Sequence, residues 1–299
     1  MANIEPRFIF RGDAVGAAGR LLRSASGEPV NQTVPVLAAS SLPVIGGVSQ
    51  ARAENCTVEM PGSDKPFLCV GLAATSAISE PDGLDKNHTT TVKCSVEKVQ
   101  ILDRVTIDSL KLSIVSQHPP QEEVARISPD VAELNGLKLD GHELAVSFDL
   151  KTFQRCSTKQ ALIEYYAKTA SFREKFGWRV SSDSPKRLRP PEFKGIIIAT
   201  VVTGIKWVGE PLPGVEICGN VIRWPGVGSI YLGELLISKH SRRLTMFRME
   251  IGGNIESLRA APKTKAKAMK LTAARAPEAD QGRGEVVVGE TQTNGTTIP

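Results

Sequence analysis

Cys156 is the residue of the sequence best placed to act as a nucleophile. It directly precedes Ser157, which we expect to cap a helix, and it follows Arg155. The positive end of a helix and a neighbouring cation both lower the pKa of a thiol and favour the reactive thiolate. A nucleophilic cysteine also needs a base, and the nearest histidine in the sequence is His142. No family signature surrounds either residue, so we expect Cys156 to pack as the apolar residue before the cap, with a catalytic role as the alternative.

A basic cluster between two apolar runs is the second candidate site. Lys239, Arg242 and Arg243 lie close together in this cluster. Two apolar runs joined by a polar segment are typical of a β-hairpin, so we expect a solvated turn. The alternative is a site for phosphate or carboxylate built on Arg242 and Arg243. Glu234 lies in the first, very apolar run and needs a partner there, which one of these two arginines would supply.

The last 42 residues, 258–299, carry a further basic patch. Its lysines are Lys263, Lys265, Lys267 and Lys270. The segment has almost no large apolar residue, so it would not bury enough surface to offset the entropy lost on folding. We expect a flexible tail that docks on a neighbouring protein or binds nucleic acid weakly. Aromatic residues make up 5% of the chain and do not interleave with the basic patches, so no stacking platform for nucleic acid is evident.

Sequence motifs for metals, cofactors and phosphate are missing. The five cysteines are odd in number and widely spaced and form no C-x-x-C pair, which argues against a disulfide framework or a structural zinc site. The glycines of "PGVGSIYLG" are followed by neither a Lys-Ser/Thr ending nor a helical pattern, so they do not form a phosphate loop. We therefore expect no cofactor and no metal, and a reducing, cytoplasmic location.

Alternation of apolar and polar residues dominates the chain and predicts strands. The runs at 92–101 and 105–114 both alternate, and each changes phase once, the second near Asp108–Ser109. A similar change falls between Met246 and Phe247, and such changes are typical of β-bulges. Asp140–Gly141 stands between two alternating runs, which is a strong signal for a two-residue hairpin turn. A further turn is expected at Arg11–Asp13.

One helix is predicted, over about residues 157–176. Ser157 and Gln160 have the spacing of a capping box, and Gly177 provides a C-terminal stop. A single helix among many strands predicts a mainly β fold of antiparallel strands and hairpins, with an α+β fold as a possibility. Alternating strand and helix units are absent, which argues against a doubly wound nucleotide-binding sheet.

The predicted strands and helix fall in a body of residues 1–257, followed by the tail at 258–299. A polar, proline-bearing segment at 117–130 suggests a subdomain boundary. The start of the chain carries charged residues where a secretory signal needs an apolar run, so we expect no export signal. The longest apolar stretch has about 15 residues, against the roughly 20 that a membrane helix needs, so no membrane span is expected.

Many strands, few groups suited to catalysis and a basic tail favour a non-enzymatic structural or interaction protein. We expect it to be a subunit of a larger assembly, with self-association or protein partners and a docking arm at its C-terminus. One alternative is an enzyme with a loop-built site that uses Cys156. A second is a nucleic-acid-associated protein that binds through the tail.

Overall fold

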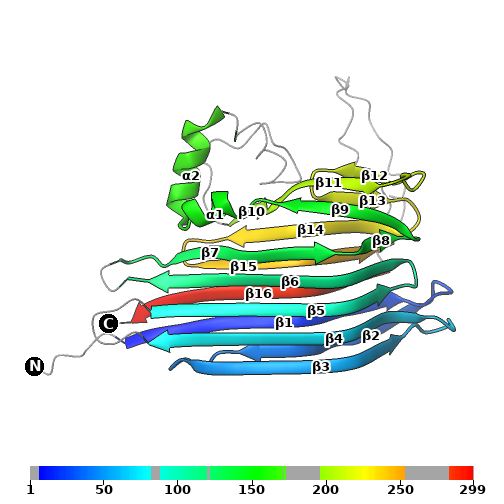
Figure 1. The fold of residues 1–299 in the computed structure, drawn as a ribbon. Coiled ribbons are helices and arrows are strands. Elements are labelled where there is room, and N and C mark those ends of the chain that lie inside the picture. Colours follow the sequence, from blue (N-terminus) through cyan, green and yellow to red (C-terminus); the bar gives the residue numbers. More distant parts are fainter. Residues whose placement is uncertain are drawn as a thin grey trace, which may run out of the picture.

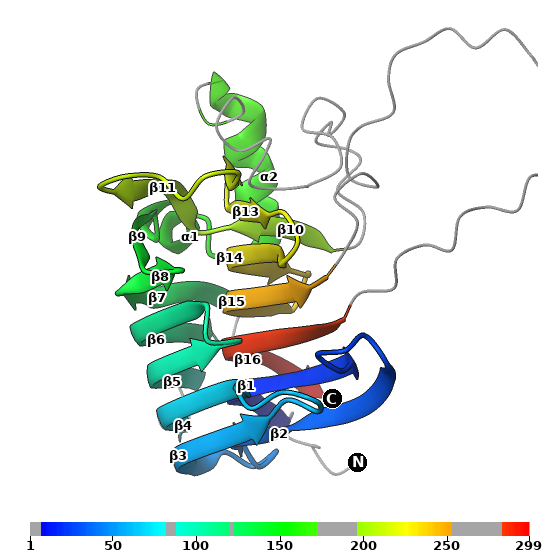
Figure 2. The same cartoon turned by 90° about the vertical axis from the view of Figure 1, so that its right-hand side faces the viewer.

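The protein is mainly β, as predicted, and consists of two eight-stranded antiparallel sheets. The computed structural model describes residues 7–81, 88–119, 122–170, 172, 196–252 and 283–298. Seen end-on, the two sheets form two stacked layers of long strands (Figure 2). The helices lie beside one end of this sandwich (Figure 1). Apolar side chains from both layers fill the space between the sheets, which explains why alternation dominates the sequence.

We name the layer that contains the first and the last strand of the chain sheet A. It is built mainly from the second half of the chain. Its order is β12 (Glu216–Cys218), β13 (Val221–Trp224), β14 (Gly228–Ile237), β15 (Ser241–Ile251), β16 (Gly284–Ile298), β1 (Arg7–Arg23) and β2 (Pro29–Ser41). The short strand β10 (Ile197–Thr200) also pairs with β14. The first strand of the chain therefore lies beside the last one.

Sheet B, the opposite layer, is built from the first half of the chain, with one later strand. Its order is β11 (Val202–Val208), β9 (His142–Phe148), β8 (Leu137–Leu139), β6 (Val105–His118), β5 (His88–Ile101), β4 (Pro66–Pro81) and β3 (Gly47–Glu59). Strand β7 (Arg126–Asn135) also pairs with β6. Consecutive strands from β3 to β6 are neighbours, so this part of the sheet is a simple meander.

Strand β16 corrects the predicted tail. It lies inside sheet A and pairs with β15 on one side and β1 on the other. Four of its side chains are completely buried: Val286, Val288, Thr291 and Thr293. The prediction of a flexible tail was therefore wrong for Gly284–Ile298. Two buried valines and a central position in the sheet suffice to place this largely polar strand in the core. Residues 253–282, with the four lysines of the basic patch, lie outside the described residues.

The helical region contains two described helices where one was predicted. Helix α1 spans Lys151–Arg155, and helix α2 spans Lys159–Lys168. The cap of α2 is Thr158, whose hydroxyl accepts a hydrogen bond from the backbone N–H of Ala161, so the predicted cap at Ser157 was wrong by one residue. The predicted stop at Gly177 lies outside the described residues. Neither helix of the described part combines the length and apolar character that crossing a membrane requires.

The predicted subdomain boundary and one predicted turn are wrong, and another predicted turn is confirmed. The segment 117–130 is no boundary, because β7 folds back onto β6 with Gln117 opposite Arg126. Arg11–Asp13 is no turn either, since it lies in the middle of β1. Asp140 and Gly141 do form the hairpin turn between β8 and β9, and both have positive φ, +46° and +84°.

The predicted phase changes in sheet B are real, but they are not bulges. Cys56 pairs with Val70, and Glu54 pairs with Leu72, so the register is the same on both sides of the change and no residue is inserted. The same holds between β4, β5 and β6. The strands instead change phase together along one row that crosses the sheet: Asn55, Gly71, Lys98, Asp108 and Gly136. Alternate members of the row, Asn55, Lys98 and Gly136, have positive φ.

Sheet A has a matching row of phase changes. The strand registers align the five residues Ala38, Gly16, Gly289, Met246 and Gly233. Here too alternate members have positive φ: Ala38, Gly289 and Gly233. A Cβ atom at Gly289 would lie 2.3 Å from Cδ2 of Leu110 in sheet B, so the two sheets approach closely at this row. The glycine is required both by the backbone conformation and by the space.

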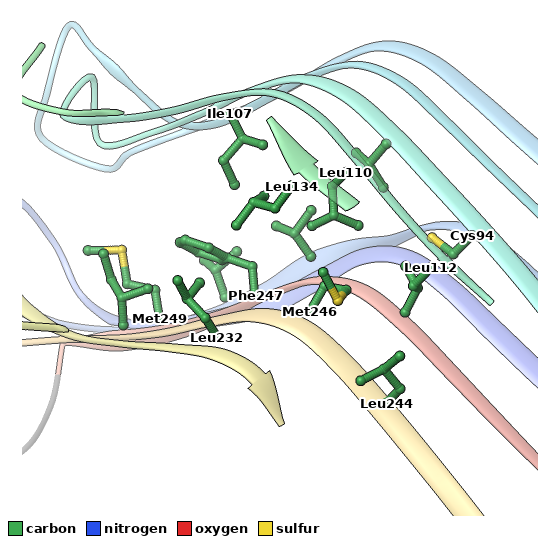
Figure 3. Close-up of a cluster of buried hydrophobic side chains, with 14 of the residues drawn as sticks. Cys94, Ile107, Leu110, Leu112, Leu134, Leu232, Leu244, Met246, Phe247 and Met249 are labelled. Carbon is green, nitrogen blue, oxygen red and sulfur yellow. The ribbon is translucent and has the colours of Figure 1, made fainter. Parts of the chain in front are cut away.

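The centre of the core lies between β6 and β7 on one side and β14 and β15 on the other (Figure 3). Ile107 and Leu110 of sheet B meet Leu232, Phe247 and Met249 of sheet A, and all five are at most 1% exposed. This packing holds the middle strands of both sheets in fixed positions. The outward faces of the same strands are therefore rigid surfaces.

Candidate functional site

Cys156 lies in a position that suppresses its reactivity. It follows the C-terminus of α1, where the helix dipole is negative. The residue is only 4% exposed. Burial raises the pKa of the thiol, and the nearby guanidinium groups of Arg242 and Arg155 oppose this shift only in part. His142 contacts the carbonyl of Glu210 through Nδ1 (3.0 Å). The geometry supports the packing role of Cys156 and gives no support to the nucleophile.

We expect Cys156 to resist alkylation in the folded protein. Cys218 is exposed, whereas Cys94 and Cys156 are buried, and burial raises the pKa of Cys94 to about 12. Iodoacetamide at about pH 7 should label Cys218 first and should reach Cys156 only after denaturation. Peptide mass spectrometry measures the order of labelling. Preferential native labelling of Cys156 would show a reactive thiolate and contradict the structural role.

Arg242 is buried, so the predicted solvated turn is wrong at this residue. The turn itself is formed by residues between β14 and β15, but Arg242 already belongs to β15 and points inward with Leu244. Its Nη2 donates a hydrogen bond to the carbonyl of Cys156 (2.6 Å), and Nη1 donates one to the carbonyl of Phe153 (3.4 Å). Burial lowers the pKa of Arg242 to about 10. The side chain holds the C-terminal carbonyls of α1 against the sheet.

The other members of the basic cluster face away from Arg242. Arg243 is the next residue of the strand, points outward and lies 3.8 Å from Glu290. An anion site shared by Arg242 and Arg243 is therefore not formed, because adjacent strand residues occupy opposite faces. Lys239 pairs with Glu123 at 2.7 Å on the surface.

Glu234 does have the partner that its apolar strand requires, but the partner is Arg248. Arg248 contacts both carboxylate oxygens of Glu234, at 2.7 and 3.0 Å, and its guanidinium lies 3.9 Å from the ring centre of Tyr231. Burial, together with the nearby carboxylate of Glu250, raises the pKa of Tyr231 to about 12. This ionic network ties β14 to β15, so we assign it to the stability of sheet A.

A groove crosses the outward face of sheet B. It has a volume of about 590 Å³ and is lined by Gln50, Ala51, Arg52, Ala74, Thr75, Ser76, Lys93, Cys94, Ser95, Lys111, Leu112, Ser113, Asp130 and Val131. These residues come from β3, β4, β5, β6 and β7, and none comes from sheet A. The groove is therefore on the outside of the sandwich. We call it the sheet B trough.

Small side chains form the floor of the trough, and the side chains of Lys93 and Lys111 project from it. Ala74, Ser76 and Ser95 leave a depression between the longer side chains of Lys93 and Lys111. The trough contains hydroxyl and ammonium donors but no histidine, and in the described parts of the chain no three His, Cys, Asp or Glu side chains gather to hold a metal. Such a lining suits binding of an anion-bearing partner rather than acid–base chemistry.

The trough residues were not predicted as a site, although their pattern is visible in the sequence. Lys93 and Ser95 are two of the polar members of the alternating run at 92–101, and Lys111 and Ser113 are two of those in the run at 105–114. Alternation indicates that they share the outward face. Their assembly into one groove depends on the register between strands, which the sequence does not specify.

The comparison with protein families matches residues 8–238, which is most of the chain, to the family model described as domain of unknown function DUF8256. The chain belongs to the DUF8256 family. No curated protein and no solved structure matched it. The DUF8256 match runs from β1 to β14 and includes every strand that lines the trough, whereas β15 and β16 lie beyond it.

Proposed function

We propose that this DUF8256 protein is a non-enzymatic interaction protein, a subunit of a larger assembly, and that the sheet B trough is its contact surface. The observation that carries the proposal is the trough itself, which has a volume of about 590 Å³ and lies across the outward face of five strands. Contact surfaces gain affinity when they are held rigid before binding. The strands below the trough are paired along their length and packed against the core on their other face.

The unusual ionisable groups of the fold support the same proposal. Arg242, Arg248 and Tyr231 have shifted pKa values, and each of them contacts other elements of the fold. A strongly shifted pKa in a cleft is a common sign of a catalytic site. Here the residues with such shifts do not line the trough, with the exception of the buried Cys94, whose thiol donates to the carbonyl of Val15 in the core.

The docking arm takes a different place in this proposal. Because β16 is a strand of sheet A, the basic segment 253–282 connects β15 to β16 and is not a C-terminal arm. Lys263, Lys265, Lys267 and Lys270 remain candidate contacts for an acidic surface or for nucleic acid. The proposal does not depend on them.

Sedimentation equilibrium tests the proposed function. We expect the apparent mass to rise above 32.2 kDa as the protein concentration is raised over about 100-fold, because weak self-association follows mass action. Exchanging Lys93 and Lys111 together for Glu should reduce the rise. Lys206→Glu, which changes an exposed lysine on β11 outside the trough, is the matched control and should not. A constant monomer mass at all concentrations would contradict self-association of this chain.

A further inference from the structure

The floor of the sheet B trough has an ordered pattern of cations and hydroxyls. Lys93 on β5 lies directly opposite Ser76 on β4 and Ser113 on β6. Lys111 on β6 lies opposite Ser95 on β5. The two ammonium groups are therefore diagonal neighbours on one face, and each stands beside a hydroxyl. This arrangement offers donors from two adjacent rows to a single acceptor-rich ligand.

Ser113 is the most informative residue of this pattern. It lies between the inward-facing Leu112 and Ile114, so its side chain points to the trough face of β6. The residue is 1% exposed, and its Oγ has no hydrogen-bond partner among the described residues. A buried hydroxyl without a partner is unfavourable and rare in native proteins. A ligand with an acceptor oxygen at the bottom of the trough would satisfy it.

The charges of the lining favour an anionic ligand. Lys93 and Lys111 are both exposed. Arg52 also lines the trough and is paired with Glu54 at 2.5 Å. Asp130 is the single acidic residue of the lining, and it occupies the β7 end, where the pairing with β6 is interrupted. The lining of the β3 to β6 part of the trough therefore carries more positive than negative charge, and Glu133 of β7 lies opposite Lys111 at its border.

The shape and the apolar lining narrow the class of ligand. The trough spans five strands, β3 to β7, which corresponds to about 19 Å at the usual spacing between strands and to about six residues of an extended peptide. Ala74 and Val131 supply aliphatic surface beside the cations. No aromatic residue is present among the lining residues, so stacking of nucleobases or sugar rings has no platform there.

We infer that the sheet B trough binds an extended acidic peptide segment of a partner protein. Its carboxylates pair with Lys93 and Lys111, and one of its oxygens accepts a hydrogen bond from Ser113. Asp130 repels acidic residues at the β7 end and so limits which segments fit. This inference rests on the proposed interaction function and names the chemistry of the partner.

Fluorescence anisotropy with a labelled peptide of alternating Glu and Ala, about six residues long, tests the inference on the full chain. We expect saturable binding that weakens as salt is added. The double change Lys93→Glu with Lys111→Glu should weaken binding about tenfold or more, because it reverses two charges at the contact. Asp130→Asn should strengthen binding, because it removes the acidic side chain that lines the trough. These opposite directions cannot arise from a general loss of folding.

Controls separate this surface from other causes. Lys206→Glu should leave peptide binding unchanged, and the peptide with Gln in place of Glu should not bind. Because charge reversal could affect folding, the neutral pair Lys93→Gln with Lys111→Gln is measured as well, and it should weaken binding to an intermediate extent.

Three outcomes would overturn the inference. They are no binding of the acidic peptide, equal binding by the trough variants, and tighter binding of a single-stranded oligonucleotide through the same two lysines. The proposed function is tested separately, by sedimentation equilibrium. An apparent mass that rises with concentration, and rises less in the trough variants, would still support that function if the peptide did not bind.

Discussion

Removal of Gly284–Pro299 is expected to abolish folding. The deleted strand β16 lies between β15 and β1, so its loss leaves two facing rows of backbone hydrogen-bonding groups without partners in the middle of sheet A. It also removes the buried side chains of Val286 and Val288 from the core. Native proteins are stable by only about 5–15 kcal/mol, and the loss of a central strand exceeds this margin. Circular dichroism and a thermal melt should show no cooperative transition.

A matched variant keeps β16 and replaces residues 254–281 by a short Gly/Ser linker. The pairing of β15 with β16 extends to Ile251 opposite Gly284, so the linker only has to join the ends of an existing hairpin. This variant should melt cooperatively near the temperature of the full chain. If the strand deletion melted like the full chain, the position of β16 in sheet A would be wrong. If the linker variant also failed to fold, the connecting segment would be needed for the core.

The exchange Gly289→Ala is expected to be the most destabilising single methyl addition that we consider. Gly289 has φ +68°, and its new Cβ would lie 2.3 Å from Leu110 and 2.9 Å from Leu112 across the core. Positive φ costs an ordinary residue about 1–2 kcal/mol. Overpacking a tight core adds about 1–3 kcal/mol more. Urea unfolding monitored by tryptophan fluorescence measures the sum.

Gly141→Ala is the matched control for backbone strain. Gly141 also has positive φ, +84°, but a Cβ there would meet nothing within 4 Å. Its free energy of unfolding should fall by only about 1–2 kcal/mol. The difference between the two variants measures the close approach of the sheets at Gly289. Equal losses in both variants would mean that the sheets are not in close contact there.

Local patterns predicted much of this fold, because strand periodicity and turn chemistry act between near neighbours. The alternating runs at 92–101 and 105–114 lie in β5 and β6, and the Asp140–Gly141 turn is present as expected. The phase changes were located correctly. Their physical basis was not predictable, because the rows led by Asn55 and Ala38 result from the alignment of several strands.

Features that depend on distant contacts were missed. The segment Gly284–Ile298 reads as polar and small, and only its partners β1 and β15 make it a core strand. Arg242 belongs to a basic cluster in the sequence, but the parity of β15 points it inward to the carbonyls of α1. A shift of one residue along the strand moves such a side chain to the other face of the sheet, and so decides whether it is solvated or buried.

The trough was beyond prediction for the same reason. Each of its strands shows outward polar positions, and nothing local indicates that Lys93, Lys111 and Ser113 meet over a floor of small residues. The registers of β4 with β5 and of β5 with β6 bring them together. Predicted strands therefore gave the parts of this surface, and only the structure gave their assembly.

Lysine footprinting across a concentration series is the most direct test of the trough as the contact surface. The unmodified chain is acetylated briefly at concentrations below and above the onset of association, and peptide mass spectrometry follows each lysine. We expect Lys93 and Lys111 to become protected as the mass rises, while the exposed Lys206 and Lys151 keep their reactivity. Unchanged labelling of Lys93 and Lys111 in a fully associated sample would contradict the assignment of the trough as the contact surface.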